Sequence, residues 1–401
     1  MPAYAINMVV PDHVPADLVY DYDVYEPGPE GSDFFAELNR LKQQAPPIFW
    51  TRCNEGHWYV NDAALANQVL RNNASFSSQM LVVPRSNNPP GRGFNPIHLD
   101  PPEHTKYRNH LSVALSRKGV AELAPGVRQL AIDLIEGLKP KGGCEFMEDF
   151  AFQLPIIVFL RLVDLPEEHR DALLPQVAQI IRPGGDKRAI IGGLAAYLRP
   201  IVEQRHADPG EDLISWLSLR EVDGKRIDLE ELHSMCTLLL IGGLDSVANT
   251  LGFFARFLAE NPDHRRQIVE NPAIVASAVE ELLRRFPTVT AGSGRLCVSD
   301  EQVGPALVKA GDQIMAPPAM MTFDPVAYPD PLKVDFSRRI NSVGTFGQGV
   351  HRCVGANLAR SELTIFLEEW LTRIPDFRLA DPDVHFHAGV NISYHRLELA
   401  W

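Results

Sequence analysis

The chain has 401 residues, 45% of them hydrophobic and 22% charged, which is the composition of a globular protein with a substantial core. Its net charge of −13 argues against nucleic-acid binding as the main activity. The five cysteines form no CxxC pair, which disfavours a disulfide framework or a structural zinc site and favours a reducing compartment.

The chain start lacks a basic stretch followed by an apolar core, so we expect no signal peptide. The most continuous apolar run, over 236–244, is too short to span a bilayer. No Gly/Ser-rich linker or charge block divides the chain. We therefore expect a single domain over 1–401, located in the cytoplasm as a monomer without membrane attachment.

Hydrophobic spacing predicts a mainly helical chain with small β-sheets. A loop rich in Pro, Gly and Asn, over 79–97, interrupts the first half. In chain order, the predicted elements are a helix over 32–44, a hairpin over 48–61, a helix over 62–72, amphipathic helices over 117–220, a small hairpin over 221–227, a long helix over 228–260, a helix over 273–285, a β-meander over 296–315 and a last hairpin over 387–401.

The long helix begins with a capping pattern at Asp228 and would be about 48 Å long, enough to cross a domain. Its middle reads LLLIGGLDS and contains two consecutive glycines followed by Asp245 and Ser246. Close packing between helices explains the two glycines. An unpaired carboxylate in the apolar centre of a helix, however, costs free energy of folding. This stretch is therefore a candidate functional site.

A second candidate site is the stretch FGQGVHRCVG over 346–355, in which three glycines surround Cys353. Glycines allow backbone angles that other residues avoid, and they let a chain approach a large flat group closely. A good helix-forming run follows, so Cys353 lies just before a helix N-terminus, where a thiolate is favoured over a thiol. A thiolate held in a loop suits a metal that takes one axial protein ligand.

The pattern F-G-x-G-x-H-x-C-x-G resembles the heme-binding loop of the cytochrome P450 family at every defined position. The resemblance implies heme b as cofactor and Cys353 as the ligand of its iron. Phe346 would pack near the sulfur, His351 would reach a heme propionate, and Gly355 would be a further cofactor-binding residue of the loop.

Three further stretches match motifs of the same family. His104 and Arg108, four residues apart on one helix face, resemble its propionate-binding HxxxR, and Arg295 would be a third propionate partner. Glu281 and Arg284 match its structural E-x-x-R pair. The GGLDS stretch resembles its oxygen-binding kink, in which Asp245 would feed protons and Ser246, where most relatives have Thr, would hold the hydrogen-bonded network.

The resemblance implies the cytochrome P450 fold, a triangular prism of helices that encloses heme between the long central helix and the cysteine-loop helix. The implied activity is insertion of one oxygen atom of O2 into an unactivated C–H bond. A peroxide-driven or isomerising heme-thiolate enzyme and a non-catalytic heme-binding sensor are the alternatives.

The substrate is expected to be a small terpenoid or norisoprenoid, and the resemblance also places the 79–97 loop among the segments that select it. The pocket would be lined by Leu238, Ile241, Leu244, Val289 and Val390, with Asn391 as a polar contact. Electrons would pass from NAD(P)H through a reductase and a [2Fe-2S] ferredoxin. The ferredoxin would dock on basic residues of the cysteine side, namely Lys106, Arg108, Lys333, Arg338, Arg339 and Arg352.

Overall fold

A computed structural model describes residues 8–26, 33–88, 93–181, 186–340 and 344–401. The chain divides into two compact units built from interleaved segments. The first unit comprises Met1–Thr105, Glu280–Cys353 and Ala388–Ile392, and the second comprises Lys106–Val279, Val354–His387 and Ser393–Trp401. A single domain over 1–401 stays a prediction.

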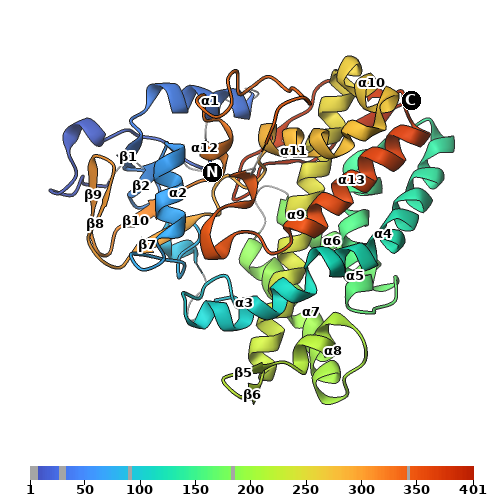
Figure 1. The fold of residues 1–401 in the computed structure, drawn as a ribbon, viewed down its shortest axis with the longest axis horizontal. Coiled ribbons are helices and arrows are strands. Elements are labelled where there is room, and N and C mark those ends of the chain that lie inside the picture. The colour runs from blue at the N-terminus through green and yellow to red at the C-terminus, as the bar shows by residue number, and fades with distance from the viewer. Residues whose placement is uncertain (1–7, 27–32, 89–92, 182–185, 341–343) are drawn as a thin grey trace. The chain divides into compact units, whose positions relative to one another are not determined.

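The first unit is built on a five-stranded sheet in the order β1-β2-β10-β7-β3. The helix α2 covers it, because Ala66, Val69 and Leu70 of α2 belong to the same buried cluster as Trp58 and Ile314 of the sheet (Figure 1). The helices and strands of this unit are α1 (Phe34–Gln44), β1 (Ile48–Thr51), β2 (His57–Val60), α2 (Ala63–Arg71), β3 (Phe76–Ser77), β7 (Gly294–Cys297), β8 (Glu301–Val303), β9 (Ala306–Val308), β10 (Gln313–Met315) and α12 (Ala319–Thr322).

The predicted hairpin over 48–61 is confirmed, and its turn shows why these residues form it. Asn54, Glu55 and Gly56 all have positive φ, which Asn and Gly tolerate best. A Cβ at Gly56 would lie 2.5 Å from the Trp50 ring, so only glycine lets the turn close over this buried side chain.

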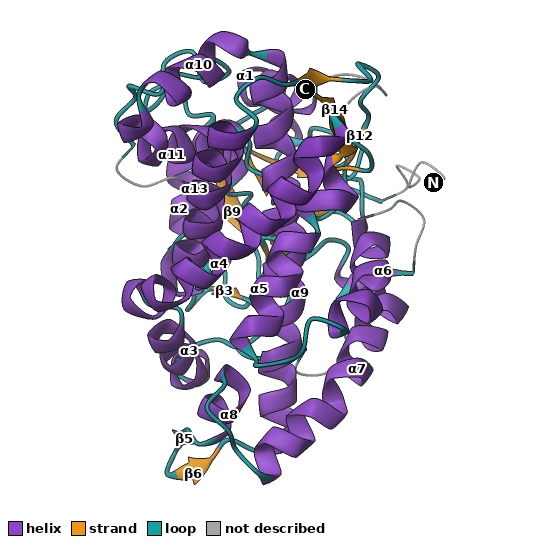
Figure 2. Ribbon diagram, turned by 90° about the vertical axis from the view of Figure 1, so that its right-hand side faces the viewer, coloured by secondary structure: helices purple, strands orange, loops and turns teal. Residues whose placement is uncertain are grey.

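The second unit is organised around the 32-residue helix α9, against which α5, α7 and α13 pack (Figure 2). The side chain of Asp228 accepts a hydrogen bond from the Glu231 amide and caps the helix as predicted. The helices α3 (Glu103–Ala114) and α11 (Val275–Arg285) contribute residues to both units. The other elements of the second unit are α4 (Arg117–Leu138), β4 (Gly143–Glu145), α5 (Gln153–Leu162), α6 (His169–Ile181), α7 (Lys187–Ala207), α8 (Leu213–Ser218), β5 (Glu221–Val222), β6 (Lys225–Arg226), α9 (Leu229–Glu260), α10 (Pro262–Glu270), α13 (Ala356–Arg373), β11 (Arg378–Leu379), β12 (Phe386–His387), β13 (Ser393–Tyr394) and β14 (Glu398–Ala400).

By length and composition alone, α9 could cross a membrane, but 61% of its most apolar window is buried inside the molecule. This burial is typical of the core helix of a globular protein.

The last hairpin is predicted wrongly at its C-terminal end. β12 pairs with β13, whereas β14 pairs with β4 and β11 in a separate three-stranded sheet. Leu397 and Leu399 are almost fully buried, and Leu399 lies opposite Cys144 in the pairing of β14 with β4.

Candidate functional site

Cys353 is the one exposed cysteine of the five, whereas the other four are buried. Its amide donates to the carbonyl oxygen of Phe346 at 2.9 Å, which closes the loop that the motif predicted. Gly349 has φ +72°, and a Cβ there would lie 2.3 Å from the carbonyl oxygen of Leu70, so the loop lies directly against α2. Gly355 is the N-cap of α13, and Cys353 therefore stands two residues before that cap.

Two of the predicted propionate partners come together in the first unit. The rings of His104 and His351 lie with their centroids 4.2 Å apart, and His104 is buried. Arg108 follows His104 by one turn on α3, where its Nε donates to Ser112 Oγ at 3.3 Å.

Arg295, on β7, is a buried cation in the first unit. It is 5% exposed, and burial lowers the pKa of its guanidinium to about 10. Its Nη1 donates to the carbonyl oxygen of Gly294, and no ion pair of Arg295 occurs among the described residues. The nearby carboxylate of Asp100 accepts hydrogen bonds from Ser77 and Ser78.

A buried guanidinium without an ion pair is costly unless an anion binds it. Within the first unit, the donor set is an exposed thiol on a glycine-rich loop, a pair of histidines and this buried arginine. Such a set fits a flat metal macrocycle that carries carboxylates, so the residues present are suited to heme.

The centre of α9 carries the second candidate site. The helix is continuous, so the predicted kink is not present as a break, and Ser246 Oγ donates to the carbonyl oxygen of Gly242 at 3.1 Å. Asn249 Nδ2 donates to Asp245 Oδ1 at 2.6 Å. A Cβ at Gly242 or Gly243 would meet no atom within 4 Å, so packing among the described residues does not require these glycines.

The predicted substrate contacts divide into three groups. Val289 forms an isolated bridge with Asn391, and Val390 lies beside it, with its carbonyl oxygen accepting from the Thr290 and Ala291 amides. Leu238 and Ile241 are partly exposed on α9. Leu244 is 1% exposed and belongs to the core of the second unit, which argues against its predicted contact with substrate.

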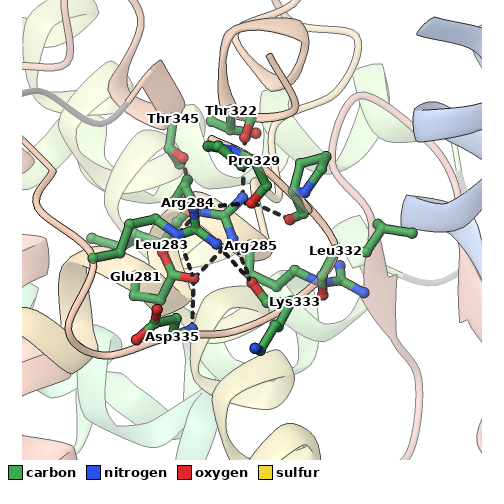
Figure 3. A network of polar contacts seen from close by, with 12 residues as sticks. Glu281, Leu283, Arg284, Arg285, Thr322, Pro329, Leu332, Lys333, Asp335 and Thr345 are labelled. Carbon is green, nitrogen blue, oxygen red and sulfur yellow. Dashed lines mark hydrogen bonds and ion pairs between the residues drawn. The ribbon is translucent and has the colours of Figure 1, made fainter. Parts of the chain in front are cut away.

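Glu281 and Arg284 form the predicted ion pair, and both side chains are fully buried (Figure 3). The guanidinium donates to both carboxylate oxygens, at 2.7 and 2.9 Å, and also to the carbonyl oxygens of Thr322, Pro331 and Lys333. The pair thereby ties α11 to the segment that precedes the cysteine loop.

The structure changes the predicted basic patch. Arg338 lies 3.4 Å from the buried carboxylate of Glu281, so it serves this internal network rather than a docking surface. Lys106 pairs with Asp223 at 2.6 Å.

Two polar residues were missed by sequence analysis. Asn249 follows Asp245 by four residues, a spacing that could have predicted their hydrogen bond. Asp100 precedes the predicted propionate helix, but its bonds to Ser77 and Ser78 join segments separated by 23 and 22 residues, which the sequence did not reveal.

Comparison with known proteins identifies the class. The Cytochrome P450 family profile matches residues 186–383. The "Probable cytochrome P450 127A1" of Sinorhizobium fredii is 31% identical over 98% of this chain and 97% of its own length. The crystal structures of CYP101J2 and CYP101C1 are 38% and 35% identical, each with a TM-score of 0.89 over 98% of this chain and 99% and 100% of theirs.

The chain belongs to the cytochrome P450 family. It is a monooxygenase of that family with heme b as its cofactor, and its mainly helical fold with small sheets is the family fold.

Proposed function

We propose that Cys353 is the axial thiolate ligand of the heme iron. The observation that carries this proposal is the exposure of this one thiol on a loop closed by the Cys353–Phe346 backbone hydrogen bond. When bound through a thiolate, heme supplies O–O bond cleavage and oxidation of the substrate. Phe346 packs near the sulfur and Gly355 ends the loop.

Arg295 binds a heme propionate together with His104, His351 and Arg108. The burial of its cationic side chain supports this role. Glu281 and Arg284 have a structural role, because their buried pair fixes the segment before the loop.

Asp245 and Ser246 deliver protons during the reaction. The carboxylate of Asp245 is oriented by Asn249, and the hydroxyl of Ser246 is held by Gly242. A positioned acid and alcohol on one helix are suited to passing protons.

The substrate is a small apolar molecule, a terpenoid or norisoprenoid. The residues we assign to substrate contact support this, because each aliphatic one is partly exposed within its own unit: Leu238 and Ile241 in the second, and Val289 and Val390 in the first, where Asn391 adds a polar group. Pockets of this kind bind through apolar contact and gain specificity from a few polar groups.

The electron donor is a [2Fe-2S] ferredoxin served by an NAD(P)H-dependent reductase in the cytoplasm. We expect docking to use the basic residues of this acidic protein, namely Lys106, Arg108, Arg339 and Arg352, because local positive charge steers an acidic partner. Reduction should slow as ionic strength rises, and a rate independent of salt would contradict this docking face.

The test of substrate class is a spectral titration of the ferric protein with monoterpenoids and norisoprenoids, followed by turnover of each binder with NADH, a ferredoxin and its reductase. Conversion to the high-spin form and a hydroxylated product would support the proposal. Turnover with peroxide alone would favour the peroxide-driven alternative, and binding of heme without turnover under either condition would favour a sensor. If none of these monoterpenoids and norisoprenoids changes the spectrum, the proposed substrate class is wrong.

A further inference from the structure

A two-stranded sheet of the second unit carries two histidines on one face. β12 pairs antiparallel with β13, and His387 stands opposite Ser393. His395 follows Ser393 by two residues, one beyond the end of β13, and side chains two apart on a strand point to the same face. His387 and His395 are therefore diagonal neighbours across the two strands, and both side chains are partly buried.

The two imidazole rings lie close enough to share one metal ion. Their centroids are 5.6 Å apart, and their planes are inclined by 35°. With Zn–N bonds of about 2.0–2.1 Å in a tetrahedral arrangement, two ligating imidazoles have ring centres roughly 5–5.5 Å apart. The rings therefore need only turn about χ2, a soft torsion in histidine, for each to aim one nitrogen at a common ion.

The surroundings of His387 keep its imidazole neutral and available. Burial, followed by the positive charges of Lys187 and His395, lowers the pKa of His387 to about 4. A metal ion binds the neutral imidazole, so this ligand has no proton to lose at neutral pH. The charge of Lys187, at the start of α7, opposes a bound cation and limits the affinity.

The donor atoms decide which kind of metal fits. Imidazole nitrogen suits zinc, copper and nickel, whereas calcium and magnesium prefer oxygen ligands. In the part of the chain that the structure describes, no third histidine, cysteine or carboxylate completes a metal-binding group here. The remaining coordination positions belong to water, so the ion is exchangeable.

We propose that His387 and His395 together bind one divalent transition-metal ion of the zinc type, which joins β12 to the end of β13. A two-stranded sheet is only marginally stable by itself, so an ion that bridges its strands stabilises it. The site uses none of the residues assigned to heme, substrate or ferredoxin, and it therefore does not depend on the proposed function.

The first experiment is a calorimetric titration of the tag-free holoprotein with Zn²⁺ at about pH 7.5, where imidazole is neutral. In His387→Asn and in His395→Asn, the dissociation constant should rise at least about tenfold, because loss of a residue that merely supports a ligand already costs 10–100-fold. The double variant should bind no more weakly than either single variant, since each single change already destroys the pair.

His385→Asn is the matched control. His385 is an exposed histidine two residues before His387, and its Nε2 lies 3.0 Å from Asp383 Oδ1. This variant should keep the wild-type dissociation constant. Equal weakening in His385→Asn, or unchanged binding in both single variants, would overturn the proposal.

Lys187→Gln tests the sign of the ligand's charge. If the ligand is a cation, removing this positive charge should tighten Zn²⁺ binding roughly three- to tenfold, as expected for the repulsion of a nearby unit charge at a protein surface. Unchanged or weaker Zn²⁺ binding in Lys187→Gln would contradict a metal at this pair.

Chemical modification of the wild type gives a test that needs no variant. Diethyl pyrocarbonate reacts with neutral imidazoles that no metal covers, and peptide mass spectrometry assigns each modified histidine. Zn²⁺ should slow the modification of His387 and His395 but not of His385, and EDTA should restore the rate. Equal rates with and without Zn²⁺ would refute the site. Protection by inorganic phosphate instead of Zn²⁺ would identify an anion site and refute it as well.

Discussion

Asn249 donates through Nδ2 to Oδ1 of Asp245 across 2.6 Å, one turn apart on α9. Asn249 is fully buried, so this bond fixes the orientation of the acid from within the helix. A carboxylate that must pass protons works best when its orientation is set in advance.

Replacing Asn249 with Leu should therefore release the Asp245 carboxylate. We expect turnover to fall by roughly tenfold while the affinity for substrate changes little, because proton transfer typically contributes 10²–10⁴-fold. The measurements are the rate of product formation per enzyme and the dissociation constant for substrate from spectral titration. Thr250→Val, which removes a hydroxyl that bonds to the Ser246 carbonyl oxygen, is the neighbouring control and should have a smaller effect. Equal losses in both variants would assign the effect to helix stability.

Ser246→Ala should increase the peroxide released per electron consumed, because it removes the hydroxyl that faces the carbonyl oxygen of Gly242. Ser246→Thr keeps the hydroxyl and restricts its rotamer, so coupling should be maintained or improved. Peroxide assays at matched NADH consumption provide the comparison. Unchanged coupling in Ser246→Ala would refute the assigned role.

Arg284→Leu should be strongly destabilising, because it leaves the buried carboxylate of Glu281 with only the more distant Arg338, at 3.4 Å, as an ion-pair partner. Breaking a buried ion pair in this way costs about 3–5 kcal/mol. We expect a matching loss in the free energy of unfolding and a lower heme content in the purified protein. Arg266→Leu removes an exposed ion pair with Asp263 and should leave both quantities nearly unchanged.

His57 should make the protein sensitive to acid. It is fully buried on β2, and burial lowers its pKa from 6.5 to about 4. The unfolded chain therefore binds a proton more readily, so the free energy of unfolding falls as the pH drops from about 6.5 toward about 4, by about 3 kcal/mol at most. His57→Leu should flatten this part of the stability profile in denaturant titrations across the range. An unchanged slope would exclude His57 as a source of the acid sensitivity.

The motifs in the sequence predicted local features well because each depends on residues close together in the chain. The Cys353 loop, the cap at Asp228 and the Glu281–Arg284 pair are of this kind, and the structure contains all three features as contacts. Their functional roles remain proposals.

Features that depend on tertiary packing were not predictable in the same way. Three features involve partners that are distant in sequence, namely the pairing of β14 with β4, the burial of Leu244 and the ion pair between Arg338 and Glu281.

The most direct test of the central claim is the spectrum of the reduced carbon monoxide complex of Cys353→Ser beside that of the wild type. The wild type should show the Soret band at ~450 nm that thiolate ligation produces, and the variant should lose that band together with turnover. A variant that keeps the band and its activity would contradict the assignment of Cys353 as the iron ligand.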